Sequence, residues 1–162
     1  MMRTVSALAI VFVTAAVVSA DEAANTKSVL SAWNRVKRLN AQSAEAMPEA
    51  SYAFKPSADV RTFGQIIGHL ANEHYSFCAE VKGEANPKKS TDFEKTTAKA
   101  DLVKALNDSN AYCDAAFASM KSDEKSFSTL LLNVTHDSEH YGNLVTYLRM
   151  KGIVPPSSQP SR

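Results

Sequence analysis

The chain has 162 residues, the length of one ordinary domain. Hydrophobic residues make up 44% of it and charged residues 22%, which excludes an intrinsically disordered chain and a collagen-like repeat. The formal net charge is +1, so there is no basic excess to neutralise a phosphate backbone, and we expect no nucleic-acid partner.

The first twenty residues have the pattern of a secretory signal peptide. Arg3 supplies the positive charge, residues 5–18 are an unbroken stretch of apolar and small residues, and residues 18–20 end it with small side chains. We expect cleavage before Asp21, which predicts a secreted or periplasmic protein with no membrane contact after cleavage. The alternative is a membrane anchor, although an apolar run of about 15 residues is short for the roughly 20 that a spanning helix needs.

Four amphipathic helices are predicted in the rest of the chain, at about residues 23–46, 63–82, 97–120 and 124–151. Pro48 ends the first, Thr62 is suited to cap the second, and Gly83 and Gly152 close the second and the fourth. Helices of roughly 20 residues, each about 30 Å long, favour an all-α four-helix bundle with a single core over residues 21–156. Residues 157–162 are predicted to be a disordered tail.

The candidate chemistry lies in four histidines on two of these helices. His136 and His140 are four residues apart, so they share one face of the fourth helix and could chelate a metal ion; the alternative is a hydrogen-bonded pair. On the second helix either His69 or His74 could point inward, and helical periodicity does not choose between them. Glu73 shares a face with His69, where it could be an outer partner, an extra ligand or a general base, or an ordinary surface residue.

Two segments carry a resemblance to a known family. FGQIIGHLA at residues 63–71 and HDSEHYGN at residues 136–143 look like the DinB superfamily of metalloenzymes. The segment 47–63 is similar to the family's lead-in to its second helix, and residues 148–156 also fit. The likeness covers essentially the whole chain after the expected cleavage site. Where many members have glutamine after His-x-Gly, this chain has Asn143.

The resemblance implies that His69, His136 and His140 hold one divalent transition metal ion. Imidazole ligands suit zinc or nickel foremost, with copper and iron as alternatives. Three such ligands leave at least one open position, which is the pattern of catalytic metal sites. Family members include hydrolases and thiol-dependent transferases, and Glu73 is the candidate catalytic residue. The alternative is a non-catalytic metal-binding or stress-associated helical bundle.

The resemblance also implies an up-down-down-up bundle with a crossover between the second and third helices. The connection 83–96 fits this independently, because about 14 extended residues can reach about 45 Å, enough to run back along a helix. Parallel helices would put Cys78 and Cys113 at similar heights along the bundle. The sequence allows two alternatives there: a disulfide between them, or two buried free thiols. The sequence leaves the small-molecule substrate unidentified, and the oligomeric state open between a monomer and a homodimer.

Overall fold

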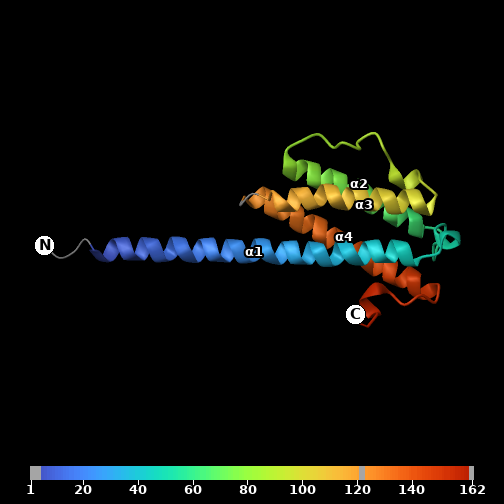
Figure 1. Ribbon diagram of the computed structural model, residues 1–162, viewed down its shortest axis with the longest axis horizontal. Helices are drawn as coiled ribbons and strands as arrows, with labels where there is room; N and C mark the ends of the chain where they lie inside the picture. The colour runs from blue at the N-terminus through green and yellow to red at the C-terminus, as the bar shows by residue number, and fades with distance from the viewer. Residues whose placement is uncertain (1–4, 121–122, 161–162) are drawn as a thin grey trace.

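The structure is a computed structural model that describes residues 5–120 and 123–160, with side-chain surroundings from residue 24 onward. Its elements are α1 Val5–Ala46, η1 Glu49–Ser51, α2 Phe63–Lys82, η2 Phe93–Lys95, α3 Lys99–Ala118, α4 Glu124–Met150 and η3 Pro156–Ser158, where η marks a short 3-10 helix (Figure 1). The described residues contain no strand, so the predicted all-α fold with four helices is confirmed. Within the same residues no helix is both long and apolar enough to cross a membrane.

At both ends of the chain the structure has helical residues beyond the four predicted helices. α1 begins at Val5 and continues through the expected signal peptide, because residues 5–46 contain neither glycine nor proline to break a helix. Residues 1–4 and the side chains up to residue 23 lie outside the described part of the chain. At the other end, the expected disordered tail starts with η3, where the Ser157 N–H donates to the Tyr141 hydroxyl at 2.9 Å. Residues 161 and 162 are outside the described range.

The ends of the inner helices follow from local capping. Thr62 and Gln65 form a capping box at the start of α2, in which each side chain bonds the other's backbone N–H. Gly83 ends α2 in the left-handed conformation, at φ 69°, which a glycine adopts without steric cost. The Asp123 side chain accepts from the Ser126 N–H and caps α4. Predicted and observed bounds therefore agree within two residues at these ends.

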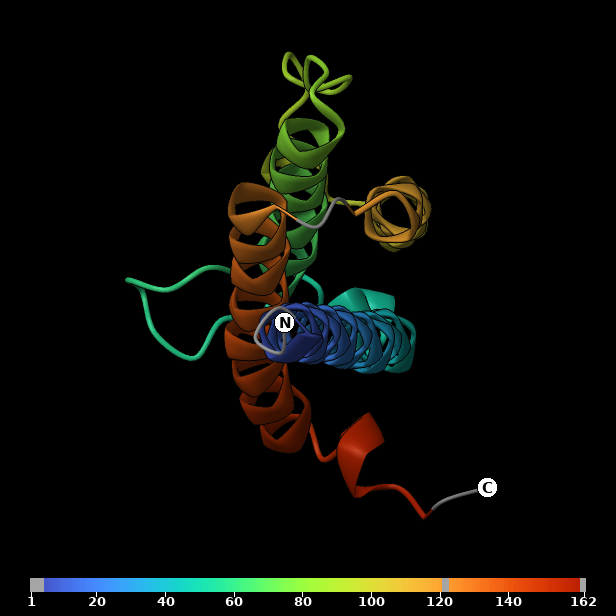
Figure 2. The same cartoon turned by 90° about the vertical axis from the view of Figure 1, so that its left-hand side faces the viewer.

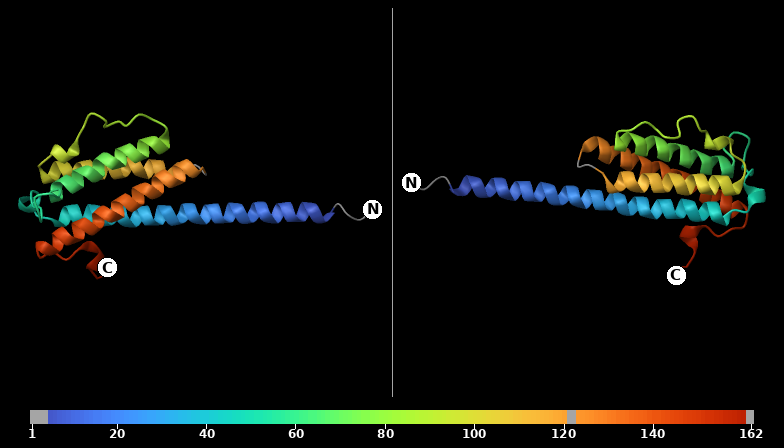
Figure 3. Two further views of the ribbon diagram at one scale, coloured as in Figure 1. Left: turned by 180° about the vertical axis from the view of Figure 1, so that it is seen from behind. Right: turned by 45° about the horizontal axis from the view of Figure 1, so that its top comes forward.

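The helices pack as a bundle in which α2 and α3 run side by side in the same direction (Figure 1). The segment between them returns along the outside of α2, as both views in Figure 3 show. In Figure 2, α1 and α3 are seen nearly end-on while α2 and α4 are inclined to them. The N-terminal half of α1 extends beyond the other helices, so the bundle is built on its C-terminal half.

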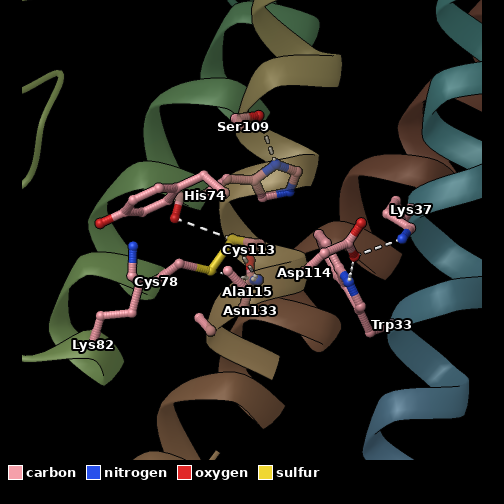
Figure 4. Close-up of a disulfide and its surroundings, with 12 residues drawn as sticks. Trp33, Lys37, His74, Cys78, Lys82, Ser109, Cys113, Asp114, Ala115 and Asn133 are labelled. Atoms are coloured by element: carbon pink, nitrogen blue, oxygen red, sulfur yellow. Dashed lines mark hydrogen bonds and ion pairs between the residues drawn. A yellow bond between two sulfur atoms is a disulfide. The ribbon is translucent and has the colours of Figure 1, made fainter. Parts of the chain in front are cut away.

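The buried apolar residues form two clusters along the bundle. One lies around the capping box and the start of α3 and includes Met47, Tyr52, Phe63, Ile67, Leu70, Leu106 and Leu148. The other lies at the far end and includes Trp33, Val36, Phe117, Leu130 and the two cysteines. Cys78 of α2 and Cys113 of α3 are joined by a disulfide with a Cα–Cα distance of 5.3 Å (Figure 4). The structure thus selects the disulfide from the two states that the sequence left open.

Candidate metal centre

Three histidines from two helices converge on one point. His69 of α2 and His136 and His140 of α4 each offer a ring nitrogen, and these three atoms all lie within 4.8 Å of one another. The Nε2 atoms of His69 and His136 are 3.1 Å apart. A tetrahedral zinc ion with Zn–N bonds of about 2.1 Å holds its nitrogens roughly 3.4 Å apart. The three histidines are therefore placed to hold a metal ion.

The outer side of the His69 ring is held by an acidic residue that the sequence analysis did not single out. Nδ1 of His69 lies 3.0 Å from a carboxylate oxygen of Glu94. Glu94 is itself fixed by Arg61, whose Nε donates to its other oxygen at 2.9 Å. With Nδ1 engaged in this way, the His69 ring presents Nε2 to the cluster, the usual arrangement of a carboxylate–histidine–metal group.

Glu94 reaches His69 because η2 is docked closely on α2. A Cβ atom at Gly68 would lie 2.4 Å from the backbone oxygen of Phe93, so only glycine lets the two backbones come this near. Asn72 of α2 accepts a hydrogen bond from the Phe93 N–H and donates one to Asp92, both at 3.1 Å. These contacts fix the position of the crossover next to His69.

The ring of His140 has a polar partner on its outer side as well. The carboxamide nitrogen of Asn143 lies 3.4 Å from Nδ1 of His140. An amide nitrogen only donates, so for Nε2 of His140 to bind an ion the Asn143 carboxamide would have to present its oxygen to an Nδ1–H. Burial, followed by the neighbouring His136 and His69, lowers the pKa of His140 to about 4. Burial, followed by Arg61, also lowers the pKa of His69. At neutral pH both imidazoles are uncharged, which is the state that binds a metal.

His74, the other candidate on α2, lies outside this cluster. It is fully buried, its Nε2–H donates to the Asp137 carboxylate at 3.0 Å, and its Nδ1 lies 3.0 Å from the Ser109 hydroxyl. Asp137 of α4 is also fully buried. Burial by itself would raise the pKa of Asp137, but His74 and His136 beside it hold that pKa below its ordinary value.

Glu73, the candidate catalytic residue, is half-buried near the cluster. Its charge acts on His69, whose pKa it raises slightly against the stronger effect of burial. Within the described residues it makes no hydrogen bond or ion pair, and the contact with His69 is made by Glu94 instead. A catalytic role for Glu73 stays a prediction.

Two polar residues of the site, Glu94 and Asp137, were missed for different reasons. Glu94 lies in an irregular connection, where no periodic pattern indicates which side chains face the bundle. Asp137 does have a signal, because Asn133, Asp137, His140 and Leu144 are spaced at four, three and four residues and all four are buried. A charged residue on that inward face indicates a paired buried group.

A pocket of about 410 Å³ opens beside His140. Arg61, Asn143, Thr146 and Asp59 supply its polar wall, and Pro56, Val60, Ile66 and Tyr147 its less polar wall. A larger pocket of about 960 Å³ lies between α1 and the C-terminal segment, and none of the three histidines lines it. Of these two pockets, the smaller is lined by a histidine of the cluster, His140.

Fold and site together define an all-α bundle placed to bind a metal ion between two of its helices. The sequence profile of the DinB superfamily matches residues 32–144, which include all three histidines. The chain belongs to the DinB superfamily, and the resemblance stated from its motifs is confirmed. No curated protein and no solved structure gives a significant match.

Proposed function

We propose that the protein is a metal-dependent enzyme whose single divalent transition ion, zinc or nickel foremost, is held by His69, His136 and His140. The observation that carries this proposal is the convergence of three imidazole nitrogens within 4.8 Å, at a site flanked by a pocket. Three protein ligands leave a coordination position for a substrate or a nucleophile, unlike closed structural sites with four protein ligands.

The substrate of this proposed enzyme is a small molecule that enters the pocket beside His140. Its volume of about 410 Å³ lies in the range of small-molecule sites. A bound ion would supply Lewis-acid activation of the substrate or of a water or thiol nucleophile, which suits hydrolysis or thiol-dependent transfer. Glu94 orients His69, and Arg61 places a cation at the pocket wall. Glu73 is our candidate for accepting the nucleophile's proton.

Metal stoichiometry is the first test of this proposal. Elemental analysis of the purified protein should find about one divalent ion per chain, and His136→Ala or His69→Ala should lose most of it. His74→Ala should retain the ion when folded, because His74 bonds Asp137 and Ser109 outside the cluster. Loss of the ion in His74→Ala but not in His69→Ala would overturn the ligand assignment.

Catalysis is tested with the same preparations. Esters, amides and thiol adducts are offered to the metal-loaded and the metal-depleted protein, and turnover should require the ion. A protein that binds one ion stoichiometrically but turns over none of these classes would instead support the non-catalytic metal-binding bundle.

We also propose that the protein acts in the periplasm or outside the cell. Two independent features support this location: the signal-peptide pattern of residues 1–20, and the Cys78–Cys113 disulfide, a bond that persists in oxidising compartments.

A further inference from the structure

Asp137 is a buried carboxylate at the centre of the bundle, next in sequence to a candidate ligand. Its side chain is fully buried. Nε2 of His74 lies 3.0 Å from each of its oxygens and donates to them, and the Asn40 amide donates to one of them at 3.3 Å. A buried carboxylate is costly unless it keeps its hydrogen-bond partners. His74 and Asn40 therefore hold the Asp137 carboxylate in one orientation.

The ring of His136 turns its unused nitrogen toward this carboxylate. Nδ1 of His136 is buried and has no hydrogen-bond partner, and among the buried polar atoms of the described residues it is the one nitrogen in that state. The nearest carboxylate oxygen is that of Asp137, at 3.8 Å, which is beyond hydrogen-bond range. His69 has a carboxylate on Nδ1 and His140 an amide, so His136 is the ligand whose outer partner is not yet engaged.

We propose that Asp137 is the positioning residue of the metal centre: when His136 binds the ion through Nε2, its Nδ1–H closes onto the Asp137 carboxylate, and His74 holds that carboxylate in place. This inference rests on the proposed function, since it concerns the same ion. The closure needs a ring movement of roughly 1 Å, from 3.8 Å to the about 2.8 Å of a charge-assisted hydrogen bond.

The anchoring of Asp137 involves every helix of the bundle. Asp137 belongs to α4, His74 to α2 and Asn40 to α1, and Ser109 on the far side of His74 belongs to α3. Figure 4 shows Ser109 and His74 facing each other across α3 and α2, one turn from the disulfide. The orientation of His136 is therefore set by the whole core and not by α4 alone, which is how a ligand ring is preorganised.

The test removes the negative charge of Asp137 and measures the affinity of the protein for a metal ion. Wild-type protein, Asp137→Asn and Glu139→Gln are titrated with Co²⁺ against a competing chelator, and the visible absorption of the bound cobalt is recorded. We expect Asp137→Asn to bind 10- to 100-fold more weakly, the usual effect of losing an outer carboxylate, with an altered cobalt spectrum. Glu139→Gln also turns a carboxylate into an amide, on an exposed side chain two residues further along α4. This control should match wild type in metal affinity and in the cobalt spectrum.

A second measurement keeps the inference testable if Asp137→Asn does not fold. In wild-type protein loaded with Zn²⁺, imidazole proton–nitrogen NMR should show His136 bound through Nε2, with a slowly exchanging Nδ1–H. Binding through Nδ1, or an Nδ1–H that exchanges like a solvent-exposed imidazole, would overturn the role of Asp137. So would a folded Asp137→Asn with wild-type affinity and spectrum.

These outcomes separate this inference from the proposed function. Wild-type protein that binds neither ion removes both ideas at once. Wild-type protein that binds one ion, with Asp137→Asn binding it equally well, leaves the metal centre standing and removes only the positioning role.

Discussion

Glu94 joins the crossover to the candidate metal centre through a single carboxylate, which contacts both His69 and Arg61. Loss of its charge removes the partner that holds the Nδ1 side of His69. We therefore predict that Glu94→Gln weakens divalent-metal binding about tenfold, measured by chelator competition. Glu73→Gln removes the same charge one turn after His69 on α2, and it should leave the affinity for the metal ion unchanged. If only Glu73→Gln weakens binding, Glu73 and not Glu94 is the outer partner of His69.

The choice between His69 and His74 shows the limit of reading single residues from the sequence. The sequence pattern allows either of them to point inward, and burial alone would favour His74. What separates them is the partner that each meets on another element: His136 for His69, and Asp137 with Ser109 for His74. Helical periodicity specifies a direction around one helix and not what lies opposite, so the pairing had to come from the family resemblance.

At the scale of elements, the contact between α2 and the crossover depends on Gly68. A methyl group there must displace the Phe93 backbone, since the added Cβ would lie 2.4 Å from the Phe93 oxygen. We predict that Gly68→Ala lowers the free energy of unfolding by about 1–3 kcal/mol, measured by urea denaturation. It should also weaken metal binding, because η2 carries Glu94.

Gly142 offers a matched control on α4. A Cβ atom at that position meets nothing within 4 Å, and the residue lies inside the helix. Gly142→Ala should therefore raise the free energy of unfolding by about 0.5–1 kcal/mol through helix propensity. Equal effects of the two substitutions would contradict the close docking of η2 on α2.

The Cys78–Cys113 disulfide leads to a prediction about the α2–α3 pair. It closes a loop with a sequence separation of 35 residues, which on the chain-entropy estimate stabilises the fold by about 3–4 kcal/mol. Reduction, or the double change Cys78→Ala and Cys113→Ala, should lower the free energy of unfolding by up to that amount while metal stoichiometry stays the same. Thiol titration of the denatured, non-reduced protein checks the bond itself: two free thiols per chain would exclude it.

The elements themselves were largely predictable, and their connections were not. Caps at Thr62 and Gly83 and proline at 48 are local signals, so the bounds of α2 and the end of α1 follow from a few adjacent residues. The length of the crossover indicated that it returns along a helix. Its docking on Gly68 depends on a backbone contact between residues 25 positions apart, which no local pattern encodes.

At the scale of the whole molecule, the N-terminal segment leads to a prediction about processing. Arg3 followed by an apolar run that ends at Ala20 should direct export and cleavage, because small residues before the cut suit a signal peptidase. Mass spectrometry of the protein from its native host should find Asp21 as the N-terminus. An intact Met1 in the membrane fraction would instead favour an anchor.

Because of the exposed crossover and the disulfide, a protease could cut the chain into two fragments that stay covalently joined. Lys88 and Lys89 are exposed in the connection between α2 and α3, where trypsin could cleave without removing any residue of the site. His69 would then lie on one fragment, with His136, His140 and Glu94 on the other, and Cys78–Cys113 would be the only covalent link between them. A nicked molecule would thus be a two-chain protein whose candidate metal site spans both chains. Adding a reductant would turn metal binding into an association reaction that depends on fragment concentration.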